Sequence, residues 1–293
     1  MLLALSATMG YAQKSWIDMT DSYIVNPRFD NNDITTGWSG TQFGAASPKE
    51  NAEHYSKTFN TYQEVSGLKA GTYRLSLNAF YRMGSSINDY SLYTSGNYAS
   101  QQYAKLYATS SVGEYEVSIV PASSAALNES LGGGVSGVGG GGWWGGGAPY
   151  IPNNMEAAYY WFEAGHYDNS VECKVGADGL LTIGIRKRTT INDDWTCIDN
   201  WKLEYYGEVV NVTSVTLSET DVEIVRSETY DLVATVLPSD ATYRNVSWSS
   251  SNTSVATVDD KGTVTATGKG TCYITATSVS YTHLRAHETP EHL

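Results

Sequence analysis

The chain has 293 residues, and its 31 acidic side chains against 18 Lys and Arg give a formal net charge of −13. This length accommodates two ordinary domains. The longest basic run is Arg186-Lys187-Arg188, so the chain lacks the positive footprint that nucleic-acid binding requires. No run of about 18 consecutive apolar residues occurs, so the sequence predicts no membrane-spanning helix.

The first 13 residues resemble the apolar and cleavage parts of a secretory signal. The small residues Gly10 and Ala12 precede an expected cut near Gln13, but the positively charged start of such a signal is missing. The alternative is a short apolar N-terminus of another kind. We expect a secreted or cell-surface protein, in the extracellular space or the periplasm.

The three cysteines, Cys173, Cys197 and Cys272, form no Cys-x-x-Cys pair and cannot all pair with one another. A disulfide scaffold is therefore excluded. A single bridge from Cys173 to Cys197 and a pair of small buried thiols both remain open.

Two-residue alternation in the first part of the chain predicts strands over residues 71–82, 114–120, 170–176, 180–187 and 197–207. The separators carry Gly, Asn, Asp and Pro, and the Asp178-Gly179 turn predicts an antiparallel hairpin between its two neighbours. The sequence therefore predicts an all-β sandwich over residues 14–207.

One short helix interrupts this pattern between residues 153 and 165. Asn153 or Asn154 caps its start and Gly165 ends it, and Met155, Tyr159 and Phe162 share the stripe expected to face the sheet. We interpret it as a lid or plug helix.

A glycine-rich stretch, residues 131–152, precedes this helix and is expected to be a flexible loop that carries Trp143 and Trp144. Gly137, Gly139 and Gly142 satisfy the Gly-x-Gly-x-x-Gly spacing. No predicted strand precedes them and no helix follows directly, so the spacing does not indicate a dinucleotide site.

Composition shifts near residues 208–211 to short alternating Val and Thr runs. The order of Pro238, Trp248, Ser-Ser-Asn at 250–252, Val-Ala-Thr-Val at 255–258, Gly262 and Ile-Thr-Ala at 274–276 resembles a group-2 bacterial immunoglobulin-like domain. The resemblance covers residues 212–278 and implies a small sandwich with Trp248 as its core anchor and a hairpin turn at 259–262. Residues 279–293 resemble a translated library adapter, so we interpret this tail as foreign to the fold.

The usual catalytic signatures are weak in this sequence. Without the tail only His54 and His166 remain, and they lack the spacing of a catalytic zinc site. Ser136 fails the Gly-x-Ser-x-Gly elbow. Asp193, Asp194 and Glu163 are acidic groups of the kind that glycosidases use, but acidic turn residues are commonplace, so an enzyme is the least favoured interpretation.

Sugar binding needs flat aromatic faces and a few polar groups that exchange hydrogen bonds with hydroxyls. The first part of the chain is rich in both, because Trp and Tyr fall in or beside expected loops. Trp161 and Trp201 are expected to pack in the core instead. The candidate ligand-binding residues are Trp143, Trp144, Trp195, Tyr150, Asn192, Asp194 and Arg186.

The two ends of this first part carry a second resemblance. An Asn26-Pro27-x-Phe29-Asp30 opening leads to Gly37-Trp38, and Asp199-Asn200-Trp201-x-Leu203 lies in the closing strand. Together they resemble galactose-binding-like jelly-roll modules of secreted Bacteroidetes proteins that act on glycans. The resemblance implies a non-catalytic carbohydrate-binding or substrate-targeting module. We interpret it as the accessory part either of a larger polysaccharide-degrading enzyme, with a covalently linked catalytic domain, or of a surface protein.

Such modules often hold one structural calcium ion between their first and last strands. The resemblance makes Asp30, Asn32, Asp33 and Asp199 the candidate ligands, since calcium takes six to eight oxygen donors. The alternative function is that of an adhesive or structural surface protein whose tyrosine-rich face binds another protein.

Overall fold

A computed structural model describes residues 14–46, 49–139, 146–207 and 210–278. The predicted signal segment, the tail after residue 278, Trp143 and Trp144 lie outside the described residues. Contacts between Cα atoms divide the chain into two compact units, one of Asp18–Glu204 and one of Tyr205–Leu293 with Met1–Ile17. No helix within the described ranges is long and apolar enough to cross a membrane.

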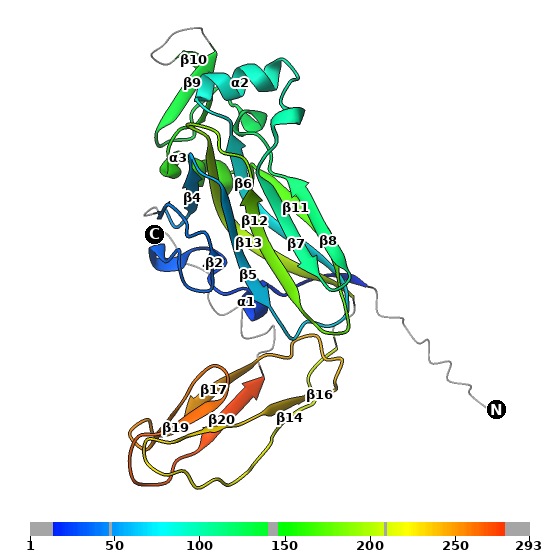
Figure 1. Ribbon diagram of the computed structural model, residues 1–293, viewed down its shortest axis with the longest axis vertical. Helices are drawn as coiled ribbons and strands as arrows, with labels where there is room; N and C mark the ends of the chain where they lie inside the picture. The colour runs from blue at the N-terminus through cyan, green and yellow to red at the C-terminus, as the bar shows by residue number, and fades with distance from the viewer. Residues whose placement is uncertain (1–13, 47–48, 140–145, 208–209, 279–293) are drawn as a thin grey trace, which may run out of the picture. The chain divides into compact units, whose positions relative to one another are not determined.

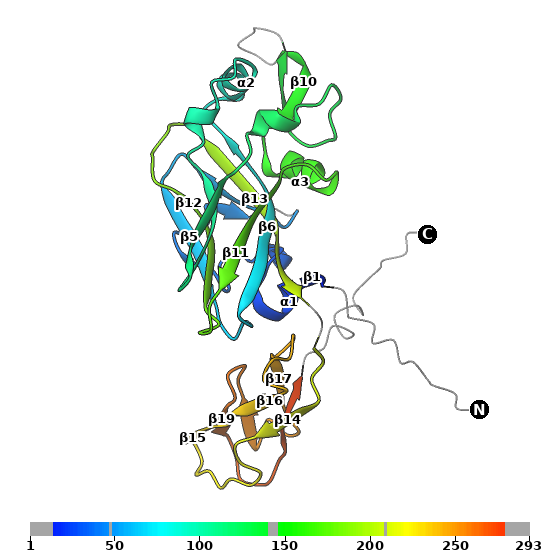
Figure 2. The same cartoon turned by 90° about the vertical axis from the view of Figure 1, so that its right-hand side faces the viewer.

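The first unit is built on two antiparallel sheets packed face to face (Figures 1 and 2). The all-β sandwich expected from the alternating pattern is confirmed. One sheet has the order β11 (Asp168–Val175), β6 (Gly71–Arg82), β13 (Trp195–Gly207), β4 (Ala52–Tyr55) and β3 (Ala45–Ala46), and β1 (Ser15–Asp18) also pairs with β13. The other has the order β2 (Ser39–Gly40), β5 (Phe59–Val65), β12 (Leu181–Lys187), β7 (Lys105–Ser110) and β8 (Gly113–Ser118).

The core between the sheets is filled by the inward-facing residues of each strand. In β5, Phe59, Thr61, Gln63 and Val65 are buried and the residues between them are exposed or half-buried, as the two-residue period of a strand requires. An aromatic cluster closes one part of the core, where the ring of Trp38, which precedes β2, lies 4.7 Å from that of Trp201 on β13. The expectation that Trp201 packs rather than binds is confirmed.

The hairpin expected at Asp178-Gly179 is wrong. β11 pairs with β6, whereas β12 pairs with β5 and β7, so the turn carries the chain from one sheet to the other. Gly179 has φ +66°, and a Cβ atom there would lie 2.6 Å from the backbone oxygen of Leu68. The Asp-Gly pair thus fits a tight corner whose two strands belong to different sheets.

Helices and a hairpin gather at one end of the sandwich (Figures 1 and 2). They comprise α2 (Ser86–Thr94), the 3-10 helix η3 (Ala122–Ala125), β9 (Val135–Gly139), β10 (Gly147–Pro152) and α3 (Met155–Glu163). Elsewhere lie α1 (Thr20–Tyr23) and the 3-10 helices η1 (Asp30–Asn32) and η2 (Ala99–Gln101). The expectation of one helix is therefore corrected, because α2 is as long as α3.

The glycine-rich stretch is not a continuous loop. β9 and β10 pair antiparallel, with Gly147 opposite Gly139 and Tyr150 opposite Gly137. A Cβ atom on Gly137 or Gly139 would lie within 2 Å of the backbone oxygen of Gly146 or Ala148. These glycines allow two backbones to approach closely, and this is why a packed hairpin forms from a sequence with few side chains.

Helix α3 begins and ends as predicted, and two of the three residues predicted to face the sheet pack in the core, since Phe162 is buried and Met155 packs half-buried against the same cluster. The side chain of Asn154 accepts a hydrogen bond from the Ala157 N–H at 2.8 Å, and the helix ends before Gly165. Ala158, Trp161 and Phe162 are buried, whereas Tyr159 is half-buried. The packing role of Trp161 is confirmed, and its indole N–H donates to the Ala125 carbonyl at 3.0 Å.

The three cysteines are free. Cys173 on β11 and Cys197 on β13 are buried and belong to one sheet, but β6 runs between their strands. Two strand spacings separate them by about 9.6 Å, beyond the reach of a disulfide. The small-buried-thiol alternative is therefore the correct one.

The second unit contains three small sheets: β14 (Ser214–Leu217) with β16 (Ala234–Leu237), β15 (Thr229–Asp231) with β19 (Thr263–Ala266) and β18 (Ala256–Val258), and β17 (Val246–Ser250) with β20 (Ile274–Ser278). The predicted turn at 259–262 joins β18 to β19, as expected. Leu232, Ala256 and Val264 are buried at the centre, and Trp248 packs against them half-buried.

Candidate functional site

The outer face of the five-stranded sheet carries a row of side chains that crosses the strands. Tyr62 on β5 is paired with Gly184 on β12, and Gly184 is paired with Tyr107 on β7. Paired residues of antiparallel strands point to the same face, so two tyrosines flank a glycine on this surface, which is turned toward the viewer in Figure 1. We call this set the tyrosine row.

Gly184 allows the Tyr107 ring to lie against the sheet. A Cβ atom at position 184 would be 2.8 Å from Tyr107 Cε1, and one at Gly40 would be 3.0 Å from Tyr62 Cε1. A larger residue at 184 would push the Tyr107 ring outward. The glycine therefore gives the Tyr107 ring its place on the sheet, and Tyr62 on the other side of Gly184 is partly exposed.

Arg186 lies over the Tyr107 ring, with its guanidinium carbon 4.5 Å from the ring centre. The same group forms an ion pair with Glu116 at 2.5 Å and another with Glu114. The hydrogen bond that Arg186 donates to Glu114 raises the pKa of Arg186 and lowers the pKa of Glu114. The two ion pairs thus hold the planar guanidinium over the Tyr107 ring, and the raised pKa keeps the group positively charged.

Polar groups continue beside the tyrosine row. The Tyr107 hydroxyl donates to Asn60 Oδ1 at 2.8 Å, and the Lys105 ammonium donates to Ser118 Oγ at 2.7 Å. Asn60 and Lys105 are both paired with Arg186 across the sheet. An aromatic row and a row of donors and acceptors therefore lie side by side on one face.

Among the predicted ligand-binding residues that the structure describes, only Arg186 lies on this face. Trp195 is in β13, not in a loop, and is 3% exposed. Its indole N–H donates to Glu53 Oε2 at 2.6 Å, and the Arg82 guanidinium lies 5.1 Å from its ring. The expected loop position of Trp195 is wrong, because the strand begins two residues earlier than its alternation indicates.

Asp194 is also buried, at 1% exposure. Its carboxylate pairs with the Lys187 ammonium and accepts a hydrogen bond from the Tyr81 hydroxyl at 2.9 Å. Burial raises the pKa of Asp194, and the bond to Lys187 opposes this rise. Asp194 therefore forms a buried structural ion pair with Lys187 and does not face a ligand-binding surface.

Tyr150 and Asn192 lie elsewhere. Tyr150 is half-buried in β10, where its backbone exchanges hydrogen bonds with Leu127. Asn192 is exposed just before β13, next to Asp193, whose carboxylate accepts from the Tyr55 hydroxyl at 2.8 Å. Trp143 and Trp144 are outside the described residues, so their predicted role stays a prediction.

The four predicted calcium ligands differ in their surroundings. Asp33 Oδ1 accepts hydrogen bonds from the backbone of Thr35 and Thr36, at 2.8 and 3.0 Å, and these bonds hold the pKa of Asp33 well below its usual range. Asp33 thus stabilises a local turn. Asp30 and Asn32 are exposed in η1.

Asp199 is 5% exposed and has the most unusual environment of the four. Burial raises the pKa of its carboxyl group to about 8, and the neighbouring carboxylates of Glu163 and Asp30 add to this rise. Ala52 is paired with Ile198, so the next positions on the two strands are Asn51, which precedes Ala52, and Asp199, which follows Ile198. Asn51 is fully buried, and its Oδ1 has no hydrogen-bond partner. Within the described ranges, no three His, Cys, Asp or Glu side chains form a ready-made metal cluster.

Sequence reasoning missed Tyr62 and Tyr107. The apolar residues of the segment 59–65 are Phe59, Tyr62 and Val65, and this spacing of three does not show the two-residue period of the strand. Because the inward residues Thr61 and Gln63 are polar, the sequence does not indicate that Tyr62 faces outward. It also does not show that β12 and β7 place Gly184 and Tyr107 beside it, because that depends on strand order.

Comparison with known proteins identifies the second unit. Residues 211–283 match the model of the bacterial Ig-like domain (group 2). An α-L-arabinofuranosidase of Bifidobacterium longum is 37% identical over 95 residues, which is 30% of this chain and 9% of that protein.

Two uncharacterised proteins of Clostridium acetobutylicum are also similar. One is 40% identical over 70 residues, 24% of this chain and 7% of that protein, and the other is 36% identical over 80 residues, 26% of this chain and 20% of that protein. The chain therefore spans at most a fifth of these relatives. The family match confirms the bacterial Ig-like part of the sequence prediction, in a chain whose described fold is all-β.

Proposed function

We propose that the first unit is a non-catalytic carbohydrate-binding module, and that the tyrosine row with Arg186 is its binding face. The observation that carries this proposal is the pairing of Tyr62, Gly184 and Tyr107 across three strands of the outer sheet face. The CH-rich face of a sugar ring packs on an exposed phenol ring, and its hydroxyls need charged or amide groups beside that ring.

The residues of this face have different roles in the proposal. Tyr62 is partly exposed and supplies the contact surface. Tyr107 is only 5% exposed, because one side of its ring lies on Gly184 and the other lies under Arg186. Tyr107 therefore positions the guanidinium, and Arg186 with Asn60 offers hydrogen bonds to sugar hydroxyls.

The setting supports a glycan-related role. One relative is named an arabinofuranosidase, and the bacterial Ig-like domain is a non-catalytic fold. In the proposal the Ig-like unit is a spacer, the protein is secreted or bound to the cell surface, and a covalently linked catalytic domain supplies the chemistry. Asp194 and Glu163 carry no catalytic role in it.

We also propose that Asp199 binds a structural calcium ion. The fit rests on two buried oxygen donors with few partners, the Asp199 carboxylate and Asn51 Oδ1. Asp30 lies close enough to raise the pKa of Asp199 and would add a further carboxylate. Asp33 does not fit, because its turn already uses the carboxylate. The cation would neutralise the buried charge and fix the chain near η1 to the last strand.

The binding proposal is tested by affinity electrophoresis and calorimetry of the full chain with soluble arabinan, arabinoxylan, xylan, galactan and β-glucan. We expect binding to at least one of them, and we expect Tyr62→Ala and Arg186→Ala to weaken it at least about tenfold, which corresponds to about 1.4 kcal/mol. Tyr93→Ala removes a tyrosine that is 41% exposed on α2 and serves as the matched control.

The adhesive alternative would be favoured by two results together. The wild-type chain would bind none of the five polysaccharides, and it would capture a protein partner that Tyr62→Ala does not bind. Equal loss of glycan binding in Tyr93→Ala and Tyr62→Ala would place the site away from the tyrosine row. Turnover of a polysaccharide by the isolated chain would contradict a non-catalytic role.

A further inference from the structure

A lysine and an aspartate lie in contact inside the core of the first unit. Lys187 is the last residue of β12, and Asp194 directly precedes β13. The Lys187 ammonium forms an ion pair with Asp194 Oδ2, and the two side chains are 0% and 2% exposed. Because β12 and β13 belong to different sheets, the contact connects the two layers of the sandwich from within.

The amine of Lys187 has little besides Asp194 to bind. An ammonium group carries three N–H donors, and Asp194 Oδ2 is its one hydrogen-bond acceptor among the residues that the structure describes. Two further neighbours are aromatic, since Phe59 is a buried residue paired with Lys187 across the sheet and the Tyr81 ring centre lies 5.8 Å from Nζ. A buried ion pair with so few hydrogen bonds is costly, so this site favours uncharged groups.

Burial acts on the pKa values of the two groups in opposite directions. It lowers the pKa of Lys187 and raises the pKa of Asp194, and in each case the hydrogen bond between the two side chains opposes the effect. Transfer of one proton within the contact gives a neutral amine, which is a nucleophile, beside a neutral carboxylic acid. These are the forms of the two groups that react to give an amide.

The Tyr81 hydroxyl on β6 activates the carboxyl group. It donates a hydrogen bond to Asp194 Oδ2 at 2.9 Å, and Tyr81 is 0% exposed. Burial, together with the charge of Asp194, raises the pKa of Tyr81, so this phenol keeps its proton. A fixed donor aimed at the carboxyl oxygen stabilises the negative charge that develops there when a nucleophile adds to the carbon.

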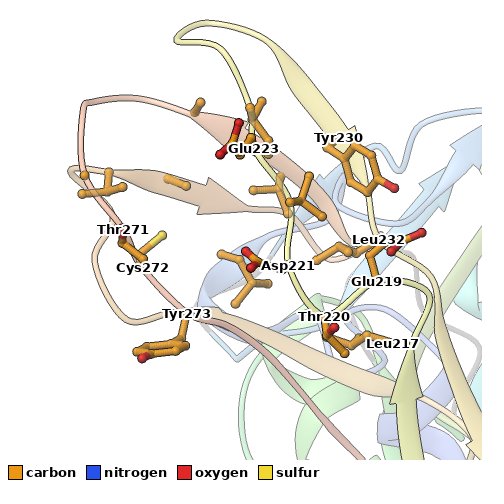
Figure 3. A pocket seen from close by; sticks show the side chains of 18 of the residues that line it. Leu217, Glu219, Thr220, Asp221, Glu223, Tyr230, Leu232, Thr271, Cys272 and Tyr273 are labelled. Atoms are coloured by element: carbon orange, nitrogen blue, oxygen red, sulfur yellow. The ribbon is translucent and has the colours of Figure 1, made fainter.

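Two other groups of carboxylates lack this setting. Lys202 pairs with Glu204 at 2.8 Å, but the Lys202 side chain is 44% exposed. Figure 3 shows Glu219, Asp221 and Glu223 around a pocket of about 560 Å³ in the Ig-like unit. These three are exposed, and none of the residues that line the pocket is a lysine. An amine and a carboxyl group that are both sealed from water are therefore particular to Lys187 and Asp194 among these groups.

From this geometry we propose that Lys187 and Asp194 condense into an intramolecular amide once the first unit has folded. The Nζ lone pair of the neutral amine attacks Asp194 Cγ, and Oδ2 receives the displaced electron pair while it accepts the hydrogen bond from Tyr81. The Nζ–Cγ bond forms and the Cγ–Oδ1 bond breaks. Oδ1 leaves as water, with the proton of the carboxylic acid and one proton from Nζ. Atoms and electrons balance without an oxidant or a reductant.

The product fits the site better than the ion pair does. The amide is uncharged, its single N–H replaces three donors, and its carbonyl oxygen keeps the hydrogen bond from Tyr81. The new bond closes residues 187–194 into a ring and joins the two sheets covalently. We therefore expect it to persist when the chain is denatured.

Mass spectrometry of the denatured full chain tests the proposal. We expect a mass about 18 Da below that calculated from the sequence, which is the mass of one water molecule. Trypsin does not cleave after an acylated lysine, so we expect Lys187-Arg188 to stay joined to residues 189–202 through the new amide. A succinimide at Asp178-Gly179 loses the same water, but it leaves these two peptides separate.

Variants at the two reacting positions provide the controls. Lys187→Arg keeps a cation but has no primary amine, and Asp194→Ala removes the carboxyl group. Both should have the full mass calculated from their sequences. A full mass of the wild-type chain, shown by circular dichroism to be folded, would overturn the proposal, and so would the same loss of water in Asp194→Ala.

A variant of Tyr81 tests the hydrogen bond to Oδ2. We expect Tyr81→Phe to contain at least tenfold more unreacted chain than the wild type, because it lacks the donor. Tyr73→Phe removes another buried hydroxyl from β6, and we expect it to react as fully as the wild type. Equal conversion of Tyr81→Phe and Tyr73→Phe would contradict the role of Tyr81 in the step.

Discussion

The core of the first unit disfavours protonation of one buried residue, His54. Its ring is stacked between Phe43 and Phe59, at centre distances of 5.0 and 4.2 Å. Nε2 lies 2.8 Å from the Thr61 hydroxyl, whereas the buried Nδ1 has no partner. Burial lowers the pKa of His54 to about 3, and the charges of Lys57 and Lys187 act in the same direction.

This depressed pKa predicts acid sensitivity. The unfolded chain binds a proton near the usual histidine pKa of about 6.5, and the native state does not until about pH 3. His54 therefore contributes stability that is complete above pH 6.5 and is lost as the pH falls, by up to about 1.4 kcal/mol per pH unit. We expect His54→Gln to flatten this loss in urea unfolding between pH 7 and 4.5. His166→Gln is the control, and an unchanged slope in His54→Gln would contradict the assignment.

Asp199 makes the calcium proposal testable by itself. A ligand that binds only the native state at 100 times its dissociation constant stabilises by about 2.7 kcal/mol. We expect Ca²⁺ to raise the melting temperature of the chelated wild-type chain by several degrees and to leave Asp199→Asn unchanged. Asp33→Asn removes a carboxylate that caps a turn, so it should melt earlier but keep the response. An equal response in Asp199→Asn would exclude this residue as a ligand.

At the scale of helices and strands, an element could be predicted from the sequence where its apolar side chains recur with a clear period. β6 occupies the predicted residues 71–82, because every second residue of a half-buried strand is apolar. Helix α2 gives no such signal. Its start is set by the Ser85 side chain, which accepts from the Asn88 N–H, and by Asp89, which is buried and bonded to Tyr98 and Ser123. The Ser85 cap is a local signal, but the burial of Asp89 depends on Ser123, 34 residues away, and this contact cannot be predicted from helix propensity.

The candidate site shows the same limit. Arg186 was predicted as a polar contact for aromatic residues in or beside loops, and the structure places it on the tyrosine row of the outer sheet face instead. Trp195 was proposed as a ligand contact, but it is 3% exposed, and Trp38, which lies outside the strands, is 4% exposed. Sequence alone does not distinguish an indole that anchors a core from one that binds a ligand, since both need the same apolar face.

At the scale of the whole molecule, the two units differ in how much apolar surface they bury. The larger unit encloses many fully buried residues, among them Leu75, Phe80 and Ile183. The Ig-like cluster has three buried members, and the side chains packed against it, including Trp248, are only partly buried. Small cores supply little net stability, so we expect the Ig-like unit to unfold first on heating.

Differential scanning calorimetry of the full chain tests this expectation. We expect two transitions, with Leu232→Ala lowering only the first and Leu75→Ala lowering only the second, because each substitution removes a buried side chain from one core and costs about 2–5 kcal/mol. A loss of 1 kcal/mol lowers the melting temperature of a small domain by about 4–8 °C and that of a larger domain by about 2–4 °C. The melting temperature of the lower transition should therefore change more. A single transition displaced by both variants would show that the units unfold together.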